Sequence, residues 1–180
     1  MVSEMNPVSE STHCSNATVS IYGSPEEAQA AISRLRECGF DLRNLSIIGR
    51  DTHSEGQVFG YYGGGDGPVR YWGKSGEFWS AVWSTLSGWG FFTVPGIGPV
   101  LVAGPLGGWI VSALDNAAIF GGLSALGAGL YSIGISKRSI VVCEAALRAD
   151  RYLLIAHGAA GEVANARQAL HDSGGFQLTA

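Results

Sequence analysis

The sequence predicts an α+β fold built from two similar halves, with an uncharged, glycine-rich hydrophobic segment between them. The first observation is an internal repeat, because aligning residues 17–39 with residues 152–174 places Gly23 on Gly158. The second is the absence of Asp, Glu, Lys and Arg from residues 78–114. The third is composition: charged residues make up 14% of the chain, against a usual value of about 25%.

The first half is expected to form a strand, a helix and a second strand. Ala17–Tyr22 is rich in β-branched and aromatic residues, which is typical of strands. Ser24 is a suitable N-cap, and Pro25 follows it at the first helical position. Gly39 can take the positive φ that ends many helices. Leu45–Gly49 is then the second strand.

The second half repeats this order. It contains a strand at Arg151–His157, a helix at Gly161–Asp172 and a final strand at Phe176–Thr179, and His157 occupies the place of Tyr22. A strand-helix-strand unit given twice is the βαββαβ, ferredoxin-like plan, in which four antiparallel strands carry two helices on one face.

The chain is therefore divided into five parts. We expect a disordered tail at 1–16, the first half of the ferredoxin-like domain at 17–50, a glycine-rich loop at 51–77, a hydrophobic helical hairpin at 78–136 and the second half of the domain at 137–180.

The hydrophobic segment is long enough for two membrane-spanning helices. If Asp115 and Asn116 form a turn, the spans run over Trp89–Ala113 and Ala117–Ile135, each close to the ~20 residues that cross a bilayer. Glu77–Leu86 would be an interfacial helix before the first span. Tryptophans near one end resemble a belt at the membrane surface, namely Trp72, Trp79, Trp83 and Trp89. The residues expected to contact lipid or to mediate self-association are Trp83, Trp89, Pro95, Gly96, Gly98, Pro99, Gly104, Pro105, Gly108, Gly122 and Gly129.

Alternatives remain open for this segment. Small residues four apart, such as Gly104 with Gly108, allow close helix packing either between subunits or within one hairpin. The whole segment is alternatively the buried core of a soluble oligomer. Asp115 is either a solvated turn residue or a functional carboxylate inside the membrane.

Composition and motifs exclude several classes of function. A net charge of -4, with eleven scattered Lys and Arg, argues against nucleic-acid binding. The three cysteines and four histidines lack metal-ligand spacing, and no nucleophile or phosphate-loop motif is present. We therefore expect no catalytic, cofactor or metal site, and hence no enzyme.

The stretch VPGIGPVLVAGPLGG, residues 94–108, resembles the bacterial general stress protein 17M-like family, which includes low-temperature-induced proteins. The resemblance covers Ala17–Gly174 and implies a short helix at Lys137–Arg148, membrane proximity and a role in stress. It carries no catalytic residues. The chain departs from the family pattern in its tryptophans and in the basic residues at Lys137–Ser139.

The expected function is that of a membrane-associated, non-enzymatic, structural or interaction protein that self-associates and takes part in a stress response. Its partners would be the lipid bilayer and copies of itself. A ligand- or lipid-sensing module, with an unidentified small-molecule ligand, is the alternative function. The expected location is the bacterial cytoplasmic membrane, with the α+β domain in the cytoplasm; a cytoplasmic soluble oligomer is the alternative.

Overall fold

The computed structural model describes residues 16–50, 74–86, 88–115 and 123–178. The predicted tail, most of the predicted loop, Trp72, Asn116 and Gly122 lie outside these residues. The elements in chain order are β1 (Ala17–Tyr22), α1 (Pro25–Glu37), a 3₁₀ turn (Leu42–Asn44), β2 (Leu45–Arg50), α2 (Lys74–Thr85), β3 (Trp89–Val94), β4 (Gly98–Ala103), α3 (Leu106–Asp115), α4 (Ala125–Ser132), α5 (Lys137–Arg148), β5 (Tyr152–His157), α6 (Ala160–His171) and β6 (Phe176–Leu178).

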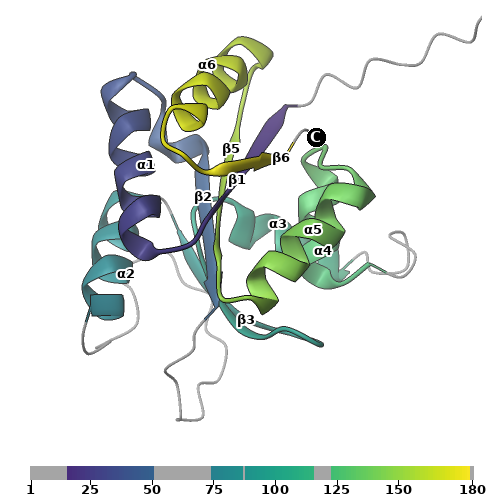
Figure 1. The fold of residues 1–180 in the computed structure, drawn as a ribbon. Coiled ribbons are helices and arrows are strands. Elements are labelled where there is room, and N and C mark those ends of the chain that lie inside the picture. Colours follow the sequence, from purple (N-terminus) through teal and green to yellow (C-terminus); the bar gives the residue numbers. More distant parts are fainter. Residues whose placement is uncertain (1–15, 51–73, 87, 116–122, 179–180) are drawn as a thin grey trace, which may run out of the picture.

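The α+β class is confirmed, and the described elements form one six-stranded antiparallel sheet with helices on both faces (Figure 1). The strand order is β3-β4-β2-β5-β1-β6. The four strands of the two repeat units lie together as β2-β5-β1-β6. The strand pair β3-β4, which comes from the inserted segment, extends the sheet at the β2 edge.

The local signals of the first half are confirmed. The hydroxyl of Ser24 accepts a hydrogen bond from the backbone N–H of Glu27 at 3.2 Å, and Pro25 begins α1. Gly39 has a φ of +76° just beyond the helix. Ala28, Ala31, Ile32 and Leu35 are the buried residues of α1, spaced as an amphipathic helix requires.

The repeat holds for the helices, but its strands face opposite ways. Tyr22 points into the layer with α1 and α6, where its hydroxyl lies 2.8 Å from that of Ser173. His157 instead packs against Trp109 of α3, on the other face of the sheet. Successive strand residues alternate between the two faces of a sheet. Aligned positions of β1 and β5 therefore point to opposite faces, although they are equivalent in the sequence repeat.

Two cores lie on the two faces of the sheet. One face packs against α1, α2 and α6, and its core includes Leu35, Trp79 and Leu154. The other packs against α3, α4 and α5, and its core includes Ile110 and Ile155. The domain is thus three layers deep, whereas the sequence predicted helices on one face only.

The predicted helical hairpin is wrong for its first span. Trp89–Ala103 forms β3 and β4, and only the rest of the span is helical, as α3. Apolar residues alternate on β4, with Val100 and Val102 in one core and Leu101 and Ala103 in the other, so both strand faces are buried. An apolar run buried on both faces of a sheet has the same composition as a membrane helix, and hydropathy alone does not separate the two.

The second span is also shorter than predicted. In residues 123–135 the helix α4 covers Ala125–Ser132 and ends before Ile133, while Asp115 is the last residue of α3 rather than part of a described turn. Among the described residues, no helix combines the length and apolar character that crossing a bilayer requires.

The predicted interfacial helix at Glu77–Leu86 does correspond to α2, although α2 begins at Lys74, inside the predicted loop. Its stripe of Phe78, Val82 and Leu86 is buried in the core beside α1. The apolar face of α2 therefore stabilises the domain and is not free for lipid.

Candidate functional site

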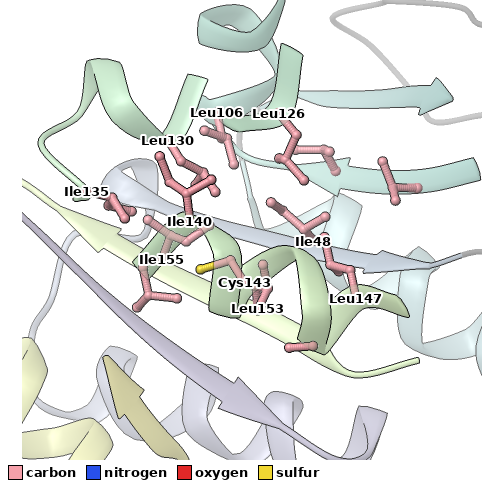
Figure 2. Packing of buried hydrophobic residues seen from close by; sticks show 14 of the residues in the cluster. Ile48, Leu106, Leu126, Leu130, Ile135, Ile140, Cys143, Leu147, Leu153 and Ile155 are labelled. Carbon is pink, nitrogen blue, oxygen red and sulfur yellow. The ribbon is translucent and has the colours of Figure 1, made fainter. Parts of the chain in front are cut away.

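The candidate site is the helical lobe, defined as α3, α4 and α5, which covers one face of the sheet. Figure 2 shows its core, where side chains of all three helices meet those of β2 and β5. The labelled residues are Ile48, Leu106, Leu126, Leu130, Ile135, Ile140, Cys143, Leu147, Leu153 and Ile155. Burial raises the pKa of the Cys143 thiol to about 12, which leaves this thiol protonated and unreactive at neutral pH.

Gly104 fixes the point at which β4 turns into the lobe. It has a φ of +97°, its N–H donates to the carbonyl of Gly88 at 2.9 Å, and its backbone lies directly on β2 at Leu45 and Ser46. Just beyond Pro105, the N–H of Leu106 donates to the Ser46 hydroxyl at 3.1 Å. Gly104 therefore allows the backbones of β4 and β2 to approach closely. It lies before the start of α3, so it does not form a helical pair with Gly108.

The PGIGP part of the motif is the tight turn between β3 and β4. Gly96 and Gly98 both have positive φ, at +79° and +100°, and Pro99 is paired with Thr93 across the strands. Pro95 and Gly96 are exposed. The Nε of Arg148, at the end of α5, donates to the carbonyl of Gly96 at 3.1 Å. The turn is therefore attached to the helical lobe.

Gly129 provides close packing within the chain. A Cβ at this position would lie 2.9 Å from Cγ1 of Ile110, which is in α3. Gly108 lies in α3, where its carbonyl accepts a bond from the Ser112 hydroxyl at 3.0 Å. For Gly129, the structure favours intramolecular packing over a subunit interface.

Of the tryptophans expected to form a belt, Trp79 and Trp83 have side chains that the structure describes, and both pack on the sheet side of α2. Trp79 is 2% exposed and packs edge-on against Phe78, with ring centroids 5.3 Å apart. Trp83 is half-buried beside Trp79, at 5.8 Å between ring centroids. Trp89 lies in β3, opposite Ala103. Trp79 in particular belongs to the core because α2 folds onto the sheet.

His157 links β5 to the lobe. Its ring meets Trp109 of α3 edge to face, with centroids 4.5 Å apart, and its buried Nδ1 has no hydrogen-bond partner among the described residues. Burial lowers the pKa of His157 below its ordinary value of 6.5, and the backbone of Asn44 opposes this shift. The neutral imidazole is thus the form that suits the contact with α3.

This contact predicts a lower unfolding free energy in acid. Because the folded-state pKa is depressed, the contribution of His157 to stability is complete above pH 6.5 and is lost as the pH falls through the folded-state value. We expect wild-type protein to lose more unfolding free energy than His157→Gln between pH 7.5 and pH 5. Urea titrations at both pH values measure the difference, and an equal loss in the two proteins would contradict the assignment.

The outer face of α5 carries exposed cationic and aliphatic side chains. Lys137 and Arg138 are exposed, and Val141 and Val142, one helical turn further on, are 64% and 37% exposed. Ile140, Cys143 and Leu147 point inward. Sequence reasoning missed the two valines, although the helical spacing of the inward residues would have placed them on the outer face.

Two small hollows lie on the opposite side of the domain, between α1 and α6. One, of about 110 Å³, is lined by residues that include Cys38, Phe40, Asp41 and Asn165. The other, of about 420 Å³, is open and is lined by residues that include Arg34. The first is smaller than the ~300 Å³ at which pockets for small molecules usually begin, and the second is a shallow polar groove.

Within the described ranges, no three His, Cys, Asp or Glu side chains converge as metal ligands. Comparison with protein-family models, with curated proteins and with solved structures gives no match. The family resemblance stays a prediction.

Proposed function

We propose that this chain is a membrane-associated, non-enzymatic interaction protein whose helical lobe provides the contact surface. The ferredoxin-like plan is our interpretation of the four repeat strands, in the order β2-β5-β1-β6, with α1 and α6 on one face. In this interpretation the helical lobe packs on the second face of the sheet.

One observation carries the proposal: the described chain between α2 and α5 contains no charged residue from 88 to 114 and none again from 123 to Ser136. Its exposed positions hold hydroxyl, glycine, proline and tyrosine residues, including Ser112, Tyr131 and Ser132. Water-facing protein surfaces are normally rich in charge, while the centres of interaction surfaces are depleted of it. A folded segment whose own exposed residues carry no charge is suited to contact with a bilayer or another protein.

The proposal differs from the hairpin expected from the sequence in the mode of attachment. The large apolar residues of the lobe, such as Leu106 and Leu130, are used in packing on the sheet. Binding in this folded form uses only residues that already face outward, so the protein attaches peripherally. Self-association and a role in stress stay predictions; the 63% exposed Phe176 on the edge strand β6 favours self-association.

Cell fractionation tests the proposal. We expect the full chain, expressed in bacteria, to sediment with membranes and to be released by carbonate, which removes peripheral proteins. Release only by detergent would instead indicate an integral hairpin and contradict the folded lobe. Recovery as a defined oligomer in the soluble fraction would contradict membrane association and favour the alternative of a protein-protein core.

A further inference from the structure

The first turn of α5 carries positive charge, whereas acidic residues are usual at the N-terminus of a helix. Lys137 and Arg138 occupy the first turn, which holds no acidic residue. The partial positive charge of the helix dipole at this end favours anions and opposes cations. No ion pair joins either residue to the described part of the chain. Two cations are therefore concentrated at a position where the described residues supply no ion-pair partner.

Apolar side chains adjoin these cations on the same helix face. Val141 lies four residues after Lys137, and Val142 lies four residues after Arg138, so each valine is one turn along from a cation. The ring of Tyr131 lies on the α4 side, with the ammonium nitrogen of Lys137 5.8 Å from its centroid. We name these five residues the basic-aliphatic face.

The other two charged side chains of α5, Glu144 and Arg148, are engaged within the chain. Glu144 is half-buried and accepts a hydrogen bond from the Ser124 hydroxyl at 2.6 Å. Arg148, at the other end of α5, donates to the Gly96 carbonyl and lies 3.9 Å from Glu144. Lys137 and Arg138 are thus the two cations of α5 that form no ion pair with the described residues.

We propose that the basic-aliphatic face is a docking surface for the anionic phosphate headgroups of a lipid bilayer. This inference rests on the proposed membrane association and specifies its lipid class. The charge of Lys137 and Arg138 is complementary to acidic headgroups, while Tyr131, Val141 and Val142 have the size and polarity to enter the interfacial layer beneath them. Long cationic side chains reach outward from an apolar base in the same way at membrane surfaces.

Vesicle sedimentation with the full chain tests this surface. We expect binding to vesicles of phosphatidylcholine with phosphatidylglycerol, and weaker binding to phosphatidylcholine alone. The double variant Lys137→Gln with Arg138→Gln removes two exposed charges and is expected to bind the mixed vesicles about 30-fold less tightly, since each cation near an anionic surface contributes about fivefold. The variant Val141→Ser with Val142→Ser is expected to weaken binding to both kinds of vesicle.

The control is Arg34→Gln with Arg36→Gln, which makes the same change in net charge on exposed positions of α1, on the opposite side of the sheet. It is expected to leave vesicle binding unchanged. Equal losses in the two double variants, or binding that is independent of phosphatidylglycerol, would overturn the docking surface while leaving membrane association in place. Absence of binding to both vesicle types, together with a soluble protein in cells, would overturn the proposed function as well.

Discussion

Replacing Trp79 with alanine is expected to lower the unfolding free energy by about 3 to 5 kcal/mol, the usual loss when a buried tryptophan is truncated. Its indole is 2% exposed and lies between Phe78, Trp83 and Tyr152, where the surrounding residues have little room to collapse. The backbone of β2 is part of the same contact, since a Cβ at Gly49 would lie 2.7 Å from Cζ2 of Trp79. Urea unfolding followed by circular dichroism measures the loss.

Trp83→Ala is the matched control, because Trp83 is on the same helix but only half-buried. We expect a smaller loss of stability from this variant. A membrane belt would give the opposite pattern for Trp79: near-normal stability in water and weaker membrane binding. That result would require α2 to leave the sheet and would contradict the described core.

Replacing Gly104 with alanine is expected to cost about 3 kcal/mol or more, because two penalties coincide at this position. Its φ of +97° is unfavourable for any residue with a side chain. In addition, the new Cβ would overlap the carbonyl oxygen of Leu45 and lie 2.8 Å from the Cα of Ser46. Relief of this overlap would displace β4 from β2. Urea unfolding compared with the wild type measures the cost.

Gly134→Ala separates the two penalties. Gly134 has a nearly identical φ of +94°, but a Cβ there would meet no atom within 4 Å. We expect about 1 kcal/mol from backbone strain alone. If the two variants were equally destabilised, the close approach of Gly104 to β2 would be unimportant. If Gly104→Ala were stable but failed to form oligomers, the subunit interface expected from the sequence would be correct and the contact with β2 would not.

The sequence predicted the elements whose signals are local. The β-branched run Ala17–Tyr22, the N-cap Ser24 and the buried stripe of α1 depend on spacings within one element, and they occur at or near the expected positions. The internal repeat likewise indicated which strands and helices belong to one sheet. For the N-cap and the helix stripe the chain alone determines the local conformation, because the relevant partners lie a few residues away.

The candidate site was only partly accessible from the sequence. The sequence singles out residues 94–108 by their motif and Lys137–Ser139 by its basic residues. The conformation expected for the first span was wrong, because an uncharged apolar run is compatible both with a membrane helix and with a strand buried on both faces. The exposure of Val141 and Val142 depends on which face of α5 meets the sheet, and that orientation is fixed by Ile140, Cys143 and Leu147 packing against distant strands.

By itself, the sequence determined an α+β domain with a duplicated strand-helix-strand unit, a glycine-dependent turn and a segment without charge. Only the tertiary structure decided that this segment adds two strands to the sheet and places two helices, α3 and α4, beside α5 on its second face. The physical reason is that the hydrophobic effect has no preferred direction or partner. Leu106, Ile110 and Leu130 lose contact with water equally well in lipid or against a sheet, and the partner is selected by contacts such as Gly104 on β2 and Gly129 on Ile110.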